Sequence, residues 1–321
     1  MSSPRRKLTI AVPLYNEAKN IPELFARLDA VMASLPSLDH DVLLIDNHSV
    51  DGSSALCLER TAQDSKYKYL AFSRNFGIEA SFHAAITYAE GDAVIFVFSD
   101  LQDPPELIPE FVHQWDNGND VVYGELQSRE DHTFFKSLGA YFAYHLIHLL
   151  SDVNIPRNAT DFRLLSRKVI LALRACPEHS RYMRGLTHWA GHRSTAVPFE
   201  RVPRKHGKSK AGFWWCVQYA FHAVISFSTK PLKLASLMGL FMTGFSILGS
   251  CVYVLHLILT RIGLNYNIQP PPPGWTTIVL LGFLFGGLNC LFMGIMGEYV
   301  AQIHQEIKAR PHFIIERKSN I

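Results

Sequence analysis

The sequence has few cysteines, and none has a spacing typical of a metal site or a disulfide framework. Its five cysteines are scattered among 321 residues without a CxxC pair. An odd, dispersed set argues against a disulfide-stabilised fold and fits a reducing compartment. A signal peptide is not expected either, because the first apolar run, Leu8–Tyr15, is short and contains Pro13. This run is expected to form a strand.

A strong excess of charge of one sign is also missing, as are the common motifs of hydrolases. The formal net charge is only +3, which gives little support for a nucleic-acid-binding protein. The histidines form no HExxH pattern and the serines have no nucleophile-elbow context, so a hydrolase is not expected. The basic residues gather instead at 201–210 and around 308–318.

Two long uncharged apolar runs, at about 234–260 and 274–297, are present and are separated by four consecutive prolines. Each run exceeds the roughly 20 residues that cross a bilayer core, so the sequence predicts a two-helix transmembrane hairpin. Lysines and arginines precede the first run and follow the second, whereas the loop between them holds only Arg261. The positive-inside rule therefore predicts a multi-pass protein of the inner or plasma membrane, with its N-terminal region and C-terminal tail in the cytoplasm.

The N-terminal region alternates strand-like and helix-like segments, which predicts an α/β, Rossmann-like domain with a parallel sheet. The expected strands are Leu8–Leu14, Asp41–Ile45, Tyr67–Phe72 and Ala93–Phe98, and the expected helices are Glu17–Ser34, Ser53–Gln63 and Phe76–Ala89. The organisation predicted along the chain is a cytoplasmic domain at 1–210, an interfacial amphipathic region at 211–232, transmembrane helices within 233–300 and a cytoplasmic tail at 301–321. A further aromatic-rich segment, 134–150, fits a core helix and a membrane-surface helix equally well.

Polar side chains follow several of the expected strands. Asn16 and Glu17, Asp46, Ser73–Asn75 and Asp100 all come directly after apolar strand segments, and the carboxyl ends of parallel strands are the usual place for a site. Asp100 and Gln102 offer oxygen ligands for a hard cation, Mg²⁺ or Mn²⁺, which takes its remaining ligands from water and substrate phosphates. The alternative is a polar turn before a helix, with Asp103 as its N-cap, and both interpretations can hold together.

Four motifs occur in a characteristic order: PLYNE at 13–17, DNHSVDG at 46–52, SRNFGIEA at 73–80 and DLQDPPE at 100–106. This series resembles the family 2 glycosyltransferases of GT-A fold, specifically the polyisoprenyl-phosphate glycosyltransferases. It is most similar to the two-span bactoprenol glucosyltransferases, relatives of dolichyl-phosphate mannose synthase. The resemblance continues through 151–167, 181–186 and 226–232, so it covers nearly the whole chain.

The resemblance implies an inverting, metal-dependent transfer of a hexose, glucose first, from a UDP-sugar to a polyprenyl phosphate. Asp100 and Asp161 would be the catalytic residues, with Asp100 and Gln102 at the metal and Asp161 at the reacting sugar and acceptor. Asp161 would serve there either as an orienting group or as a weak base. The residues implied at the nucleotide sugar are Pro13, Tyr15, Glu17, Asp46, Ser99 and Gln102. The alternatives are mannosyl transfer from GDP-mannose and a non-catalytic membrane protein that retains the fold. A homo-oligomer is compatible with the resemblance.

The chain departs from the family pattern at one position, because Phe98 stands where the family commonly has the first acid of an Asp-x-Asp pattern. Two of the carried-over roles also have structural alternatives. Asp46 could cap the next turn, and Glu17 could be a carboxylate favoured in a first helical turn. The candidate cations for the acceptor phosphate are Arg129, Arg163, Arg181, Arg184, Arg201, Arg204, Lys208 and Lys210. For those within 201–210, general attraction to anionic lipid headgroups is the alternative.

Overall fold

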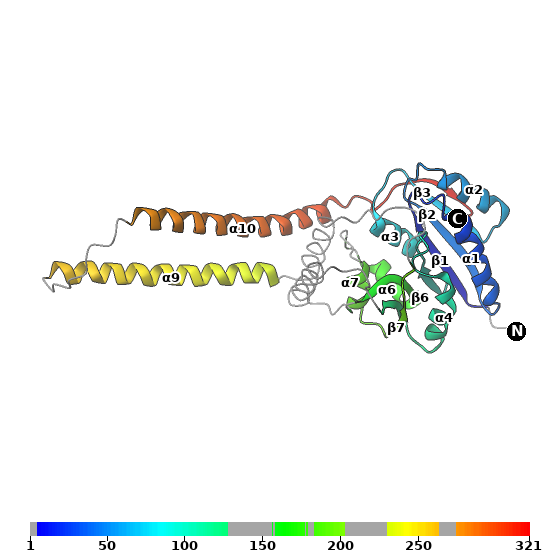
Figure 1. Ribbon diagram of the computed structural model, residues 1–321, viewed down its shortest axis with the longest axis horizontal. Helices are drawn as coiled ribbons and strands as arrows, with labels where there is room; N and C mark the ends of the chain where they lie inside the picture. The colour runs from blue at the N-terminus through cyan, green and yellow to red at the C-terminus, as the bar shows by residue number, and fades with distance from the viewer. Residues whose placement is uncertain are drawn as a thin grey trace. The chain divides into compact units, whose positions relative to one another are not determined.

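The computed structural model describes residues 5–127, 156, 158–176, 178, 183–202, 230–262 and 274–321 (Figure 1). The chain divides into two units. The first comprises residues 1–226 together with 308–321, and the second comprises residues 227–307.

The first unit is built on an eight-stranded sheet with the order β7-β5-β6-β4-β1-β2-β3-β8. β1 lies between β2 and β4 and is parallel to both, and β2 is parallel to β3. β6 is antiparallel to β4, and β8 is antiparallel to β3. The bounds are β1 Lys7–Leu14, β2 Asp39–Asp46, β3 Tyr67–Phe72, β4 Ala93–Phe96, β5 Val121–Leu126, β6 Ala159–Ser166, β7 Ser194–Phe199 and β8 Ile315–Ser319. The predicted parallel sheet is therefore confirmed at its centre.

Helices cover the sheet in two groups. α1 contacts α2 and α4, whereas α3 contacts α6. The bounds are α1 Ile21–Ser34, α2 Ser53–Gln63, α3 Ile78–Tyr88, the short 3₁₀ helix η1 Pro105–Leu107, α4 Ile108–Asp116, α6 Arg167–Ala175 and α7 Met183–Trp189. In α1, Leu24, Leu28 and Val31 recur at helical spacing and are buried, as expected for a helix with one apolar face. The strands between the layers are buried on both sides, so they are almost continuously apolar.

Most expected elements are confirmed, two of them with identical bounds: the helix Ser53–Gln63 and the strand Tyr67–Phe72. The prediction that the first helix begins at Glu17 is wrong, because α1 begins at Ile21. The N–H of Glu17 donates to Oγ of Ser53, the first residue of α2, at 3.0 Å, and the N–H of Ala18 donates to Oδ2 of Asp51, in the loop after β2, at 3.0 Å. The backbone there is thus held in a turn.

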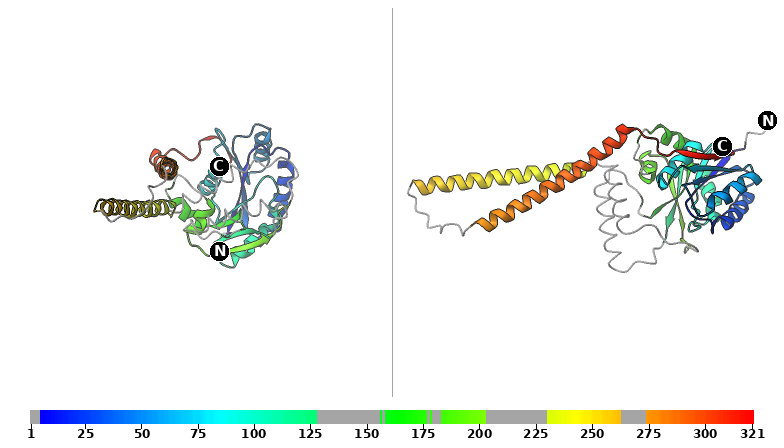
Figure 2. Two further views of the ribbon diagram at one scale, coloured as in Figure 1. Left: turned by 60° about the vertical axis from the view of Figure 1, so that its left-hand side comes forward. Right: turned by 90° about the horizontal axis from the view of Figure 1, so that it is seen from above.

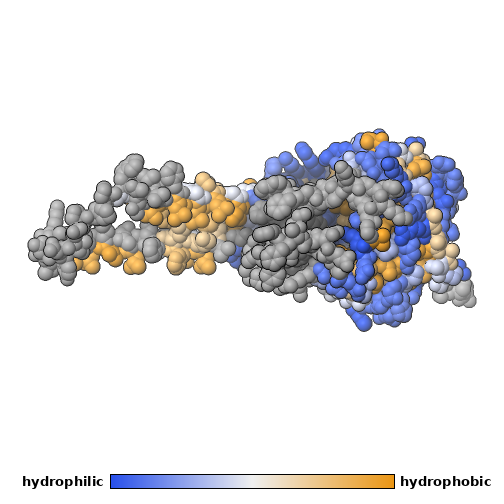
Figure 3. All heavy atoms as spheres, viewed as in Figure 1, coloured by the Kyte–Doolittle hydropathy of each residue, from blue (hydrophilic) through white to orange (hydrophobic). Residues whose placement is uncertain are grey.

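The second unit contains two long helices, α9 Lys230–Arg261 and α10 Trp275–Lys308, at the positions of the two predicted apolar helices. Apolar side chains are exposed along both helices (Figure 3). Phe241 is 76% exposed and Ile278 is 71% exposed. Among the described residues, one stretch, Leu284–Lys308, is long and apolar enough to cross a membrane. The predicted interfacial region up to residue 229 and the segment 134–150 lie outside the described residues.

The C-terminal tail contributes a strand to the sheet of the first unit (Figure 2). β8 pairs with β3 so that Arg317 lies opposite Ala71. After the strand, the amide of Asn320 donates to the carbonyl oxygens of Thr61 and Tyr67, at 2.7 and 2.9 Å. The tail covers an edge of β3 that would otherwise expose unpaired backbone groups. The sequence predicts only a cytoplasmic location for 301–321, and its first eight residues continue α10.

Candidate active site

A tight turn follows β1 and begins the site. Asn16 has a positive φ of 56°, a conformation that asparagine tolerates better than most residues. Its N–H donates to Ser49 Oγ at 2.9 Å, and its side-chain oxygen accepts from the N–H of Val50 at 2.8 Å. These bonds join the turn after β1 to the turn after β2, which places Tyr15 and Glu17 beside the end of β2.

Asp46, the last residue of β2, is fully buried. Its carboxylate accepts hydrogen bonds from the N–H of Ser49 at 2.9 Å, from the hydroxyl of Tyr69 at 2.7 Å, and from the hydroxyl of Ser54. Both oxygens are therefore engaged within the protein. This geometry supports the turn-capping interpretation of Asp46, and its contact with the base of a nucleotide stays a prediction.

The segment after β4 is tied to β1 and to α3. Ser99 is buried, and its hydroxyl donates to the carbonyl oxygen of Pro13 at 3.1 Å. Ser99 thus links the two strand ends that were predicted to line the nucleotide site. Phe98 packs edge-to-face against Phe82 of α3, with 6.0 Å between ring centroids. The missing acid is thus replaced by a packing residue, which explains how the site tolerates an apolar side chain there.

Asp100 and Gln102 lie on a turn bent by Leu101, whose φ is 58°. The N–H of Gln102 donates to Asp100 Oδ1 at 3.2 Å, which holds the carboxylate over the turn. No group of three or more His, Cys, Asp or Glu side chains that could hold a metal occurs among the described residues. The donor set still fits Mg²⁺ or Mn²⁺, because such an ion takes only one or two protein carboxylates when substrate phosphates supply the other oxygens.

Asp103, which the sequence predicts only as a helix N-cap, is buried beneath this turn at 1% exposure. Arg201 donates from Nε to Asp103 Oδ1 at 3.0 Å, and the N–H of Val202 donates to the carbonyl oxygen of Gln102 at 3.1 Å. The expectation that Asp103 caps a helix is wrong, because Pro104 occupies the N-cap of η1 and no side chain caps it. Asp103 instead binds the segment 200–202, which follows β7, and holds it against the Asp100 turn.

Burial raises the pKa of Asp103 to about 6, against the lowering effect of Arg201. The carboxylates of Asp100 and Asp161 raise the pKa further, so both lie within electrostatic reach of Asp103. Strand pairing gives the geometric reason. β4 and β6 are antiparallel with Ile95 opposite Leu164, so the start of β6, which carries Asp161, lies toward the carboxyl end of β4.

Asp161 is held by two arginines. Arg184 donates to both carboxylate oxygens, from Nε at 3.1 Å and from Nη2 at 2.5 Å. Arg163 Nη2 lies 3.4 Å from Asp161 Oδ1. Desolvation opposes ionisation of Asp161, but the charges of Arg184 and Arg163 outweigh it and lower the pKa of this carboxyl. The carboxylate is therefore anionic at neutral pH, with about a fifth of its side chain exposed.

Arg163 is almost fully buried, at 1% exposure. Its guanidinium also donates to Thr187 Oγ1 at 2.5 Å and to the carbonyl oxygen of Thr160 at 2.8 Å. The prediction that Arg163 binds an acceptor phosphate is not supported by this geometry, because its donors face the protein interior. Arg163 supports Asp161 from below, and Arg184, a quarter exposed, borders the site. The candidate cations Arg129, Arg181, Arg204, Lys208 and Lys210 lie outside the described residues.

Comparison with known proteins gives a family match and several long relatives. The family model described as glycosyl transferase family 2 matches residues 9–174. An uncharacterised glycosyltransferase of Synechocystis sp. is 36% identical over 309 residues, which cover 96% of this chain and 94% of the relative. A bactoprenol glucosyl transferase of Shigella phage SfX is 31% identical over 312 residues, covering 97% and 99%. A putative glycosyltransferase of Bacillus subtilis is 33% identical, covering 98% and 92%.

Proposed function

The chain belongs to glycosyl transferase family 2 and is a glycosyltransferase, and on that premise we propose that it transfers a hexose, glucose first, from a UDP-sugar to a polyprenyl phosphate. A phosphate oxygen of the acceptor attacks the anomeric carbon, the bond from that carbon to the diphosphate oxygen breaks, and UDP leaves. The configuration at the carbon inverts. The relatives named bactoprenol glucosyl transferases, aligned over nearly their full length, support the lipid acceptor.

The observation that carries this proposal is the meeting of two carboxylate sites at one edge of the sheet. Asp100 lies on the turn after β4, and Asp161 lies at the start of the neighbouring antiparallel strand β6. The charges of both raise the pKa of the buried Asp103. A donor diphosphate at Asp100 and a sugar near Asp161 would therefore be held in one place, which is what a displacement between two bound substrates requires.

The leaving group needs its charge neutralised. Asp100 and Gln102 would hold Mg²⁺ or Mn²⁺, which supplies that neutralisation at the diphosphate. Asp103 would not be a ligand, because its carboxylate is bound to Arg201. Its role is to keep the Asp100 turn and the segment 200–202 joined. The basic run 201–210 begins within that segment, and acceptor binding by Arg204 and Lys210 in this run stays a prediction.

Asp161 would orient the substrates and would not act as a strong base. The acceptor does not need one, because a phosphate monoester has a second pKa near 6 and is mostly a dianion at neutral pH. The lowered pKa of Asp161 makes this carboxylate a poor proton acceptor. Fixed by Arg184 and Arg163, it offers a rigid hydrogen-bond acceptor to a sugar hydroxyl.

A lipid acceptor requires the enzyme to lie at a membrane. We propose that α9 and α10 form a hairpin that crosses the inner or plasma membrane twice, with the catalytic domain in the cytoplasm. The apolar exposed surfaces of both helices support this arrangement, as does the stretch Leu284–Lys308. Association of the hairpin with a second copy of the chain stays a prediction.

The test supplies the purified full-length chain with a polyprenyl phosphate and, in separate reactions, labelled UDP-glucose, UDP-galactose, a UDP-N-acetylhexosamine or GDP-mannose. Each reaction is run with Mg²⁺, with Mn²⁺ and with EDTA. Transfer of label from UDP-glucose into the organic phase, abolished by EDTA, is expected. Label from GDP-mannose alone would establish the mannosyl alternative. Nucleotide binding without lipid-linked product from any donor would establish the non-catalytic alternative.

A further inference from the structure

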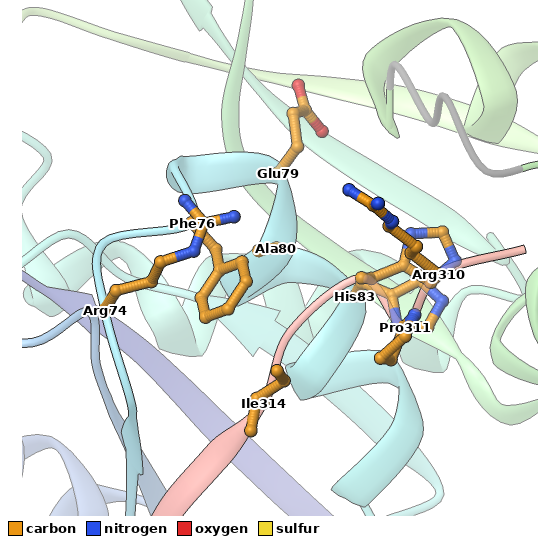
Figure 4. A pocket seen from close by; sticks show the side chains of 9 residues that line it. Arg74, Phe76, Glu79, Ala80, His83, Arg310, Pro311 and Ile314 are labelled. Carbon is orange, nitrogen blue, oxygen red and sulfur yellow. The ribbon is translucent and has the colours of Figure 1, made fainter. Parts of the chain in front are cut away.

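A cavity of about 610 Å³ lies in the first unit between the start of α3 and the chain segment just after α10 (Figure 4). The residues that line it do not belong to the proposed donor, metal or acceptor sites. One wall comes from the SRNFGIEA motif and the helix it begins, and the other comes from residues 310–314. The lining residues are Arg74, Phe76, Glu79, Ala80, His83, Arg310, Pro311, His312 and Ile314.

Cationic and imidazole side chains dominate the polar part of this cavity. Arg74 stacks on the ring of Phe76, with 4.1 Å from its guanidinium carbon to the ring centroid, which restrains the side chain at the rim. The rings of His83 and His312 stack with centroids 3.9 Å apart, which joins the two walls. Within the described part of the chain, neither Arg74 nor Arg310 forms an ion pair. Two guanidinium groups thus border one cavity without a carboxylate partner from that part of the chain.

Glu79 is the one acidic residue of the lining, and its carboxylate binds the backbone of α7. Oε2 of Glu79 accepts a hydrogen bond from the N–H of Met183 at 3.2 Å. Met183 precedes Arg184, which binds Asp161. Glu79 therefore joins the cavity wall to the start of α7, one residue before the arginine that binds Asp161.

The start of α3 adds a further positive contribution. α3 has 11 residues, and no side-chain hydrogen bond caps its N-terminus. The first N–H groups of a helix lack intrahelical partners, and with the helix dipole they favour an anion. Ala80, in the first turn, lines the cavity. The helix end and the two arginines therefore favour the same sign of charge.

We propose that this cavity binds the phosphate group of a ligand, with Arg74 and Arg310 as its principal donors. A guanidinium group can donate two parallel hydrogen bonds to two oxygens of one phosphate, and it stays charged at every relevant pH. Arg310 follows Lys308, the last residue of α10, by two positions, which limits their separation to about 7 Å. A lipid headgroup is therefore one source of the phosphate, and a soluble phosphate compound is the other.

The experiment measures the thermal unfolding midpoint of the full-length chain in a neutral detergent. In one arm inorganic phosphate is titrated at constant ionic strength. In the other arm phosphatidylglycerol replaces phosphatidylcholine in mixed micelles. The proteins compared are the wild type, Arg74→Gln/Arg310→Gln, Arg310→Gln alone, and Arg317→Gln. The last is the matched control, because it removes one exposed positive charge from the same tail outside the cavity.

A rise of about 3 to 5 °C is expected for the wild type at about ten times the dissociation constant. The rise should persist in Arg317→Gln, shrink in Arg310→Gln and vanish in the double variant. A response confined to phosphatidylglycerol assigns the site to a lipid headgroup, and one confined to inorganic phosphate assigns it to a soluble ligand. No response in either arm, or an equal response in the wild type and the double variant, overturns the proposal. If the double variant does not fold, Arg310→Gln decides. Because no sugar transfer is measured, failure here leaves the proposed function intact.

Discussion

Arg184 forms a two-point hydrogen bond with the carboxylate of Asp161, at 3.1 and 2.5 Å. The two residues lie on different elements, α7 and β6, and the buried Arg163 supports the same carboxylate from within the protein. A carboxylate fixed in this way has a restricted orientation and a lowered pKa. It suits the orientation of a substrate better than the acceptance of a proton.

The substitution Asp161→Asn tests this role. We expect kcat to fall by about 10²- to 10³-fold, because the fixed negative charge near the reacting sugar is lost while the shape is kept. The shape of the pH–rate profile should not change, since Asp161 does not take the proton. The measurement is kcat between pH 6 and 9. The control is Asp116→Asn, which removes the carboxylate of a surface ion pair with Arg6. Turnover close to that of the wild type would rule out a catalytic role.

The substitution Asp100→Asn tests the cation site. Loss of an anionic ligand should lower kcat/KM and raise the Mg²⁺ or Mn²⁺ concentration needed for half-maximal rate. The loss should exceed the roughly 10- to 100-fold effect of outer-shell changes at metal sites. Rates are measured over a metal titration. Unchanged metal dependence in Asp100→Asn would show that the cation is not held there.

The buried Asp103 should make stability depend on pH. Its folded-state pKa, about 6, lies above the ordinary value of 3.8. Protonation therefore favours the folded state, and the contribution of Asp103 is fully present below about pH 4 and lost as pH rises through 6. As the pH rises from 4 to 7, the wild type should lose about 2–3 kcal/mol of unfolding free energy that Asp103→Asn keeps.

Urea unfolding at a series of pH values measures this difference. Arg201→Gln provides a second readout, because loss of the arginine removes an influence that lowers the pKa of Asp103. In Arg201→Gln, the pH range over which stability is lost should therefore lie higher than in the wild type. A difference between Asp103→Asn and the wild type that stays constant over this range would contradict the assignment.

Arg174 should stabilise the fold without touching the site. Its guanidinium donates to the carbonyl oxygens of Ile86, Thr87 and Ala89 at the end of α3, at 2.8, 3.1 and 2.8 Å. Arg174→Met removes these three bonds and should cost about 1–3 kcal/mol, since among the described residues only the carbonyl oxygen of Ala89 keeps a side-chain donor, Arg167 Nη1 at 3.1 Å. Lys168→Met, on the exposed face of the same helix, is the matched control. Equal unfolding midpoints for the two variants would refute the capping role, and kcat should be unchanged in both.

Charge reversal at Arg204 separates two interpretations of the basic run 201–210. If Arg204 binds the acceptor phosphate, Arg204→Glu should lose transfer activity while membrane association stays unchanged. If the run only attracts anionic headgroups, each charge contributes about 1 kcal/mol, and activity and association should fall together. Sedimentation with vesicles and a transfer assay on the same sample measure both.

The sequence by itself determined the alternation of strands and helices, the two apolar helices and the order of the motifs. These features depend on local periodicity and composition, which each segment carries without its neighbours. The position of Asp100 after a buried strand is of this kind, as is the expected strand Tyr67–Phe72.

Only the tertiary structure decided which side chains bind one another. Arg184 could not be paired with Asp161 from the sequence, nor Asp103 with Arg201, because strand order and register bring these residues together. Asn320 reaches the carbonyl of Thr61 across 259 positions of the chain, and Arg74 shares a cavity with Arg310. Such contacts arise from packing between distant segments, and local patterns do not specify which polar partners a buried group will find.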